Sequence, residues 1–496
     1  MSIKKIEWPK NPIIFQINTW SWLYGLSETY NYPITLKNVP EEVLDKEISL
    51  FDAVWLMGIW ERSPKGREIA IQHPDLQQEY HSALRYFSTD DVVGSPYSVH
   101  YYHVDSHLGG QEGLAFFRKQ LADRGILLLL DYVPNHVAVD HIWTLEKSDM
   151  FIQGTFEEQI SNPYDFFSVG DKVYAHGRDP YFPPWSDTVQ INAFSLDARQ
   201  KAINTLLNIA RQCDGVRCDM AMLLINKVFK RTWGERVGTP PEKEFWQEII
   251  PAVKEKFPNF KFIAEVYWDL EWDLLQQGFD FCYDKRLYER LLHDNAESIR
   301  EHLQADWDYQ SRLVRFIENH DEKRAIKVFG EERSRAAAII SLTLPGARLI
   351  HEGQMRGHSI KLPIQLRRRP MEVDITELMD FYQNLLKIIP GKEKGKGQWE
   401  LCKIEPVAND NSYKNLIAYT WSFVNKNILI VVNFSTYLTH GHVRIKGAHY
   451  GFNEWTFRDL LTEEEYTYKG EDLDTYGLYV DLDAWKGHIF DIKKIE

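Results

Sequence analysis

Acidic, basic and imidazole side chains follow four short apolar runs in this 496-residue chain. The four segments read DYVPNH (131–136), GVRCD (215–219), AE (264–265) and FIENHD (316–321). At the end of a single strand, a charged residue is commonly a solvated end or a helix N-cap. Four such ends together predict a shared site, because burying like charges side by side is costly unless function retains them.

Three carboxylates and an arginine suit the cleavage of a glycosidic bond. That reaction needs a proton donor, a nucleophile or base, and stabilisation of an oxocarbenium-like transition state. Arg217 lies two residues before Asp219, so on a strand both side chains point to one face, where the cation keeps the carboxylate ionised and nucleophilic. Glu265 lies between the apolar residues Ala264 and Val266, which favours the protonated form and the role of acid.

Eight short apolar runs must position these residues. Most are continuous rather than alternating, as expected of parallel strands buried on both faces, and helical patterns such as 112–124, 199–212 and 333–342 separate several of them. Alternating strands and helices, with eight strands in all, predict an α/β fold of the (β/α)8 TIM barrel type, whose active residues collect at the C-terminal ends of the strands. The expected strands are Ile14–Ile17, Ala53–Met57, Ile126–Val133, Gly215–Asp219, Phe262–Val266, Phe279–Tyr283, Leu313–Glu318 and Ala347–His351.

The spacing of these strands predicts two additions to the barrel. The stretch 137–197, rich in Pro, Gly, Asp and aromatic residues, is expected to be a small domain inserted after the third strand. After a charged linker at 391–397, the chain over 398–496 has short β-rich runs with turn residues and no strong helix between them, which predicts an antiparallel β-sandwich. The catalytic barrel is then expected over 1–136 and 198–390.

The composition excludes several classes of function. The chain has 58 Lys+Arg against 72 Asp+Glu, a net charge of −14 that repels phosphate backbones and anionic lipid, so no nucleic acid and no membrane surface is expected as a partner. No apolar run is long enough to span a membrane, and the start MSIKKIEWPK has no apolar signal-peptide core. The four cysteines form no C-x-x-C pair. We therefore expect a cytoplasmic protein, and nothing in the sequence indicates an oligomeric state.

The segments DYVPNH, GVRCDMA, AEVYW and FIENHDE resemble the four signature regions of the α-amylase family, glycoside hydrolase family 13. They occur in the family's order, and the resemblance covers residues 13–350. It implies a (β/α)8 barrel with an inserted domain after strand three and a C-terminal β-sandwich. No cofactor is implied, because side chains can supply both protonation and nucleophilic attack.

The resemblance assigns a role to each matched residue. It makes Asp219 the nucleophile, Glu265 the general acid/base and Asp321 the third carboxylate, which grips the 2- and 3-hydroxyls of the sugar. Arg217 would orient the nucleophile, and Asp131 would anchor that part of the rim. The side chains expected to hold the sugar on the non-reducing side of the cut are His136, His320 and Tyr97.

Three positions depart from the family's pattern. Many α-amylases bind a structural calcium ion through an Asp in a further short motif and a His four residues after the nucleophile, and the matching residues here are Gln190 and Leu223. Leucine offers no oxygen to Ca²⁺, so no metal is expected, although Asn135 survives as a candidate ligand. The Lys-His pair that contacts the leaving-group sugar is replaced by Met222-Leu223, which indicates an apolar acceptor side.

The sequence thus predicts a retaining α-glycosidase whose substrate is an α-1,4-linked glucan, either a polysaccharide or a malto-oligosaccharide. A transglycosylase, in which a sugar hydroxyl replaces water, or a phosphorylase, in which phosphate does, would use the same site. A non-catalytic sugar-binding protein is a third hypothesis, opposed by the complete set of acid, nucleophile and third carboxylate. Trp268 and Trp272, just past Glu265, are candidates for an aromatic platform on the acceptor side.

Overall fold

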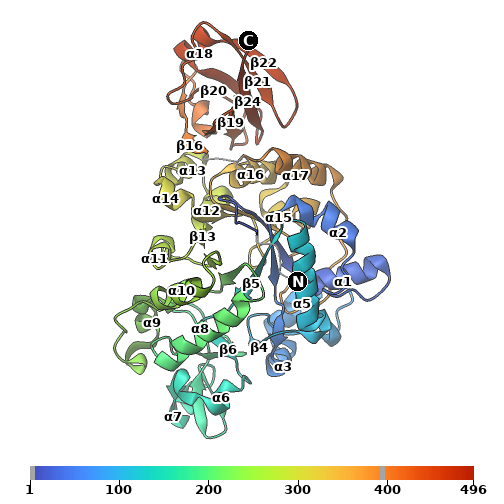
Figure 1. The fold of residues 1–496 in the computed structure, drawn as a ribbon, viewed down its shortest axis with the longest axis vertical. Coiled ribbons are helices and arrows are strands. Elements are labelled where there is room, and N and C mark those ends of the chain that lie inside the picture. Colours follow the sequence, from blue (N-terminus) through green and yellow to red (C-terminus); the bar gives the residue numbers. More distant parts are fainter. Residues whose placement is uncertain (1–5, 391–396, 496) are drawn as a thin grey trace. The chain divides into compact units, whose positions relative to one another are not determined.

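The computed structural model describes residues 6–390 and 397–495, which divide into two compact units (Figure 1). The predicted linker at 391–397 falls outside the described residues, apart from Gly397. The first unit consists of residues 6–8, 14–283 and 360–371, and the second of residues 9–13, 284–359, 372–390 and 397–495.

Eight strands form a closed barrel in the order β1-β15-β14-β13-β12-β11-β5-β2, which confirms the predicted (β/α)8 fold class. Nearly every residue in these strands is buried, and this is why they read as continuous apolar runs. The bounds are β1 (Ile13–Asn18), β2 (Ala53–Met57), β5 (Leu127–Tyr132), β11 (Gly215–Cys218), β12 (Lys261–Ala264), β13 (Phe281–Tyr283), β14 (Leu313–Arg315) and β15 (Ala347–His351).

The register of three neighbouring strands in the first unit decides which side chains meet. Arg217 of β11 pairs with Asp131 of β5 in a parallel register. On the other side of β11, Cys218 pairs with Ala264 of β12, so Asp219 and Glu265 both follow directly after this pair. The three strand ends therefore deliver one cation and three carboxylates at the same level of the sheet.

Helices α5 (Gly110–Asp123), α8 (Leu196–Ala210) and α16 (Glu331–Thr343) overlap the three predicted helical patterns. In the first unit, α8 lies against α10 (Phe245–Lys256) (Figure 1). Among the described residues, no helix combines the length and the apolarity needed to cross a lipid bilayer. The remaining α-helices outside the predicted domain additions are α1 (Thr19–Tyr30), α2 (Glu41–Lys46), α3 (Pro64–Gln72), α4 (Pro74–Ala83), α9 (Asn226–Trp233), α11 (Glu271–Gln276), α12 (Lys285–His293), α13 (Ala296–His302), α14 (Trp307–Gln310), α15 (Ala325–Phe329) and α17 (Thr376–Ile388).

The stretch between β5 and α8 contains small sheets of its own. One is the pair of β6 (His136–Ala138) with β10 (Thr188–Gln190), and the other has the order β7-β9-β8. A separate apolar cluster that includes Val137, Phe151 and Tyr174 supports them. The elements of the second sheet and the two helices here are β7 (Gln153–Gly154), β8 (Phe166–Val169), β9 (Lys172–Ala175), α6 (Trp143–Glu146) and α7 (Phe156–Ser161). The proposed boundaries of this domain at 137 and 197 stay a prediction.

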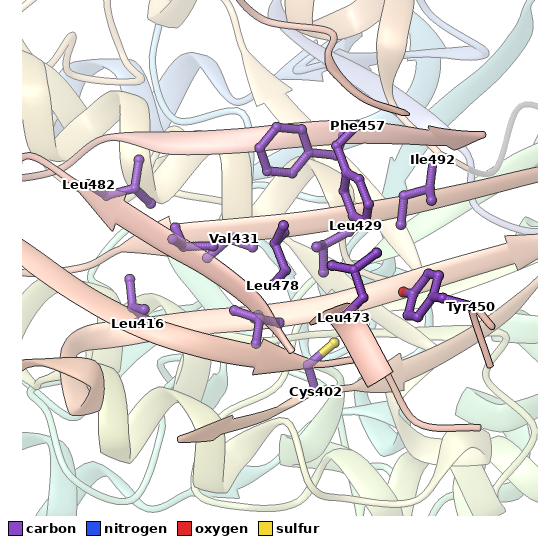
Figure 2. Packing of buried hydrophobic residues seen from close by; sticks show 14 residues of the cluster. Cys402, Leu416, Leu429, Val431, Tyr450, Phe457, Leu473, Leu478, Leu482 and Ile492 are labelled. Atoms are coloured by element: carbon purple, nitrogen blue, oxygen red, sulfur yellow. The ribbon is translucent and has the colours of Figure 1, made fainter. Parts of the chain in front are cut away.

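The C-terminal part has two antiparallel sheets, with the orders β16-β18-β19-β24-β21-β22 and β17-β20-β23. Their inward side chains share one core, to which Leu429 of the first sheet and Leu478 of the second both contribute (Figure 2). One helix here, α18 (Gly470–Tyr476), was not predicted, because seven residues are too few to show helical periodicity. The strands are β16 (Gln398–Leu401), β17 (Lys403–Glu405), β18 (Leu416–Phe423), β19 (Lys426–Asn433), β20 (Thr439–Arg444), β21 (Glu454–Asp459), β22 (Glu465–Lys469), β23 (Leu478–Leu482) and β24 (Gly487–Lys494).

Candidate active site

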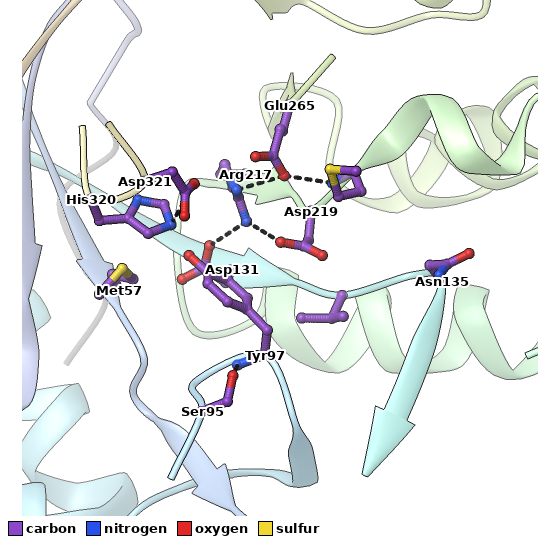
Figure 3. A network of polar contacts seen from close by, with 12 residues as sticks. Met57, Ser95, Tyr97, Asp131, Asn135, Arg217, Asp219, Glu265, His320 and Asp321 are labelled. Atoms are coloured by element: carbon purple, nitrogen blue, oxygen red, sulfur yellow. Dashed lines mark hydrogen bonds and ion pairs between the residues drawn. The ribbon is translucent and has the colours of Figure 1, made fainter. Parts of the chain in front are cut away.

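The guanidinium of Arg217 contacts three carboxylates of the first unit (Figure 3). Its Nη1 lies 2.7 Å from Oδ1 of Asp219 and 3.6 Å from Oδ1 of Asp131. Its Nη2 lies 2.6 Å from Oε2 of Glu265. All four side chains are buried. Two of the residues expected to perform catalysis, Asp219 and Glu265, are thus held by the two ends of one planar group.

The charge of Arg217 is permanent in this setting. Burial alone would lower the pKa of its guanidinium, but the negative charge of Glu265, with a smaller contribution from Asp219, raises that pKa well above its usual value. The ring of Tyr97 lies 5.1 Å from the guanidinium carbon and that of Trp55 lies 5.4 Å from it. A fixed cation that faces Asp219 stabilises the ionised form of that carboxylate.

Glu265 accepts hydrogen bonds from two groups that were not predicted from the sequence. Besides its contact with Arg217, its Oε2 accepts from the backbone N–H of Met220 at 2.6 Å, and its Oε1 accepts from the hydroxyl of Tyr267 at 2.9 Å. Donors of this kind favour the ionised carboxylate. The apolar neighbours Ala264 and Val266 do not describe the surroundings of the Glu265 carboxyl group, because adjacent side chains on a strand point to opposite faces.

The backbone of Met220 is unusual. Its φ of 41° lies in the left-handed region, which residues with a side chain seldom adopt. The residue directly follows the expected nucleophile Asp219, and its N–H points at Glu265. The identity of a methionine does not predict a hydrogen bond from its backbone N–H. The position of Met220 directly after Asp219 is the one sequence feature that could have indicated this donor.

Asp131 is the third carboxylate on Arg217, and it is buried. Burial raises the pKa of its carboxyl to about 7, against the opposing effect of the Arg217 charge. The group therefore changes its charge near neutral pH, whereas Arg217 does not.

Tyr97 and His136, both predicted to hold the sugar, lie in the first unit near the Arg217 cluster. The ring of Tyr97 lies against the guanidinium of Arg217 (Figure 3). Burial lowers the pKa of His136 to about 4, so its imidazole is neutral at pH 7. A neutral imidazole can donate one hydrogen bond and accept another, which suits a sugar hydroxyl.

His320 and Asp321 belong to the second unit, where they follow β14. Nε2 of His320 lies 3.0 Å from Oδ2 of Asp321. The turn that carries them is shaped by Asn319, whose Oδ1 accepts the backbone N–H groups of Asp321 and Glu322 at 2.9 and 3.0 Å. The parts that these two residues play in sugar binding stay predictions.

Two residues that the family resemblance matches to calcium-ligand positions, Asn135 and Gln190, form hydrogen bonds with each other. Nε2 of Gln190 donates to Oδ1 of Asn135 at 2.9 Å, and Nδ2 of Asn135 donates to Oε1 of Gln190 at 3.2 Å. Leu223 is buried beside the strand ends of the first unit. Within residues 6–390 and 397–495, no three His, Cys, Asp or Glu side chains gather in a way that could hold a metal ion. Each amide thus satisfies the other without an ion.

Exposed ring surface follows the expected acid. The ring of Trp268 meets that of Tyr181 edge to face, with centroids 4.9 Å apart. The guanidinium of Arg231 contacts the hydroxyl of Tyr181, and its central carbon lies 4.9 Å from the centroid of the Tyr181 ring. Tyr181 is 55% exposed, whereas Met222 and Leu223 are fully buried, so the aromatic pair rather than that dipeptide offers surface to a ligand.

The backbone that carries Trp268 is strained. Trp268 and Asp269 have φ values of 66° and 60°, two consecutive residues in the left-handed region. Such conformations cost about 1–3 kcal/mol each and cluster at ligand-binding and active sites. Trp272, the other candidate for the acceptor side, lies on α11 and is 45% exposed.

Known proteins are similar to this chain in sequence. The sequence model described as "Alpha amylase, catalytic domain" matches residues 51–385. The Alpha-amylase MalA of Haloarcula japonica is 24% identical over 346 residues, which cover 68% of this chain and 47% of that protein. The Cyclomaltodextrinase of Thermoanaerobacter pseudethanolicus is 21% identical over 377 residues, which cover 72% of this chain and 59% of that protein. The chain thus spans about half to three-fifths of the length of these curated relatives.

Solved structures show the same fold. A maltogenic alpha-amylase, AmyB, from Thermotoga neapolitana superposes with a TM-score of 0.68 at 18% identity, over 97% of this chain and 98% of that one. An alpha-amylase from Geobacillus thermoleovorans, complexed with acarbose, superposes with a TM-score of 0.66 at 18% identity, over 99% of both chains. At this identity the likeness concerns the fold alone.

Asp131→Asn is expected to change how stability depends on pH. The pKa of Asp131 is about 7 in the folded chain, whereas an unfolded aspartate has a pKa of about 3.9. Between these values the folded state holds a proton that the unfolded state releases, so this group lowers the free energy of unfolding as the pH rises. Asparagine does not titrate, so the free energy of unfolding of the variant should rise relative to that of the wild type by about 2.6 kcal/mol between pH 5 and pH 8, measured by urea unfolding.

Asp171→Asn is the matched control, because Asp171 is exposed in the turn between β8 and β9. Its stability difference from the wild type should be the same at both pH values. If the difference in free energy of unfolding between Asp131→Asn and the wild type is also the same at both pH values, Asp131 does not titrate in this range.

Removal of calcium is expected to leave the protein unchanged. The melting temperature, measured by differential scanning fluorimetry, should be the same in EDTA and in excess CaCl2. Gln190→Asp should melt lower in both, because Asn135 loses its amide partner and an unsatisfied buried group costs about 1–3 kcal/mol. A calcium-dependent rise of the wild-type melting temperature that Asn135→Ala abolishes would contradict this prediction.

Proposed function

Because the chain belongs to the α-amylase family, we propose that it is a retaining α-glycosidase that hydrolyses α-1,4-linked glucans or malto-oligosaccharides. The observation that carries this proposal is the contact of one guanidinium, that of Arg217, with both Asp219 and Glu265. Retention needs two carboxyl groups close together, at about 5–5.5 Å. Two carboxylates bound to one planar cation support such a pair.

In the proposed reaction, Asp219 attacks the anomeric carbon while Glu265 gives its proton to the leaving oxygen. The bond to the leaving sugar breaks, and a covalent glycosyl-enzyme forms on Asp219. Glu265, now ionised, takes a proton from water, which attacks the anomeric carbon and releases the sugar with its configuration retained. The donors from Arg217, Met220 and Tyr267 support the second step, because they stabilise the ionised carboxylate.

On the donor side of the cut, the neutral imidazole of His136 and the ring of Tyr97 would hold the sugar. Asp321 would grip the 2- and 3-hydroxyls, and its contact with His320 would orient both side chains. Asp131 would anchor the rim through Arg217. These roles come from the family resemblance, and the contacts named here support them.

The predicted organisation is part of the proposal. The catalytic barrel would comprise 1–136 and 198–390, with 137–197 as the inserted domain and 398–496 as the C-terminal sandwich. The separate sheets in the latter two stretches support this division. A cytoplasmic location is supported by four cysteines that are all buried and free of disulfides.

Transfer to a second sugar is the alternative that one observation favours. Trp268, three residues past Glu265, is partly exposed and meets the 55% exposed Tyr181. The two rings offer surface to an acceptor sugar, which phosphate would not use. A chain with this pair would hold a leaving or incoming sugar long enough for some transglycosylation beside hydrolysis.

Asp219→Asn is expected to lower kcat/KM for maltotriose by about a thousandfold or more, because the nucleophile is removed. With α-maltosyl fluoride, the wild type should accumulate a glycosyl-enzyme that intact mass spectrometry detects and peptide mapping places on Asp219. Asp294→Asn, at the exposed C-terminal end of α12, is the control and should keep wild-type turnover. Near-normal turnover of Asp219→Asn on every α-glucoside tried would remove the proposed mechanism.

Trp268→Ala and Tyr181→Ala are expected to weaken the acceptor side only. For malto-oligosaccharides, KM should rise by about two- to tenfold and the ratio of transfer to hydrolysis products should fall, since each ring contact contributes about 0.5–1.5 kcal/mol. An aryl glucoside has no leaving sugar, and its kcat/KM should stay unchanged. Tyr164→Ala, an 85% exposed tyrosine in the same inserted stretch, is the control. Equal losses on both substrates would assign the pair to structure instead.

A further inference from the structure

The outward face of the β17-β20-β23 sheet carries aromatic rings. Buried and outward positions alternate along β20 and β23. The inward positions hold apolar residues such as Leu478 and Leu482, which belong to the core between the two sheets (Figure 2). The outward positions hold His440 and His442 on β20 and Tyr479 on β23. These rings are therefore not part of the core that the sheet covers.

Four rings form a continuous row on this face, which we name the ring row: Tyr476, His442, Tyr479 and His440. Their successive centroids are 6.5, 5.6 and 6.4 Å apart. The pairing of His442 opposite Tyr479 across the two strands fixes the middle of the row. Tyr476 is 59% exposed and Tyr479 is 44% exposed, so packing within the chain does not account for these large rings.

Carboxylates flank the ring row on both sides. Oδ2 of Asp410 lies 2.6 Å from Nε2 of His440 and fixes that ring. The exposed Asp481 pairs opposite His440. Glu405 of β17 pairs opposite His442, and its carboxylate forms ion pairs with Lys403 at 2.8 Å and Arg444 at 2.6 Å. A row of ring faces edged by carboxylates matches a chain of sugars, which has apolar faces for the rings and hydroxyls for the oxygens.

We propose that the ring row is a second glucan-binding site, which binds a linear α-glucan chain. The inference rests on the proposed function, because it assigns the same class of ligand to a second face. A second copy of this chain is a poorer occupant. In a symmetric dimer each face meets itself, and the exposed Asp481 would then be brought near its own counterpart.

The test is affinity electrophoresis in native gels that contain amylopectin, with the Asp219→Asn chain so that the polysaccharide stays intact. Adding Tyr476→Ala and Tyr479→Ala should raise the dissociation constant by at least about fivefold, the loss expected for two ring contacts. Phe452→Ala is the matched control, because Phe452 is 90% exposed in the same unit but lies outside the ring row. It should be retarded as strongly as the parent.

If the double variant is retarded as strongly as the parent, the second site is overturned. It is also overturned if Phe452→Ala loses as much retardation as the double variant does. Size-exclusion chromatography that shows the double variant converting a dimer to a monomer would assign the row to self-association instead. Each tyrosine is also replaced singly, so that misfolding of the double variant does not decide the result. Hydrolysis of maltotriose by the unaltered chain tests the proposed function separately. If the unaltered chain hydrolyses maltotriose but its retardation does not depend on the ring row, only the second site is overturned. If retardation depends on the ring row but the chain hydrolyses no maltotriose, only the proposed function is overturned.

Discussion

A buried guanidinium loses its hydration, and the penalty of several kcal/mol is offset only if anions are placed around it with good geometry. Arg217 meets this requirement through Asp219, Glu265 and Asp131, which come from three neighbouring strands. Removing one carboxylate would leave part of the charge uncompensated. The parallel register of β5, β11 and β12 is therefore coupled to the site, because a slip of one residue would turn these side chains to the other face.

The same cation would have opposite effects on the two steps of the proposed reaction. It stabilises the ionised Glu265 that would activate water, and it opposes the protonated Glu265 that would start the reaction. Asp131 shares Nη1 with Asp219, and because its pKa is raised to about 7, its carboxyl gains or loses charge near neutral pH. The balance of charge around Arg217 thus depends on a carboxyl that is itself neither the nucleophile nor the acid.

The sequence was informative where a buried strand ends in a charged residue. Asp131 and Glu265 each close a continuous apolar run, and Asp219 closes the short buried strand that carries Arg217. That pattern predicted both the barrel strands and the three carboxylates on Arg217. Half-exposed strands such as β16, β21 and β22 have no such run, since only part of each faces the core, and they were missed. Contacts that depend on backbone conformation or on distant loops were missed as well, such as the N–H of Met220 and the pairing of Tyr181 with Trp268.

Backbone strain lies on both sides of the expected acid. Met220, whose N–H reaches Glu265, and Trp268, three residues past Glu265, both have left-handed φ values. Each costs about 1–3 kcal/mol, and such strain persists only where the surroundings determine the conformation. The hydrogen bond from the Met220 N–H to the carboxylate of Glu265 stabilises this conformation, and Arg217 holds that carboxylate in place. The free energy gained by compensating one buried cation thus also sustains the strained turn that aims a donor at Glu265.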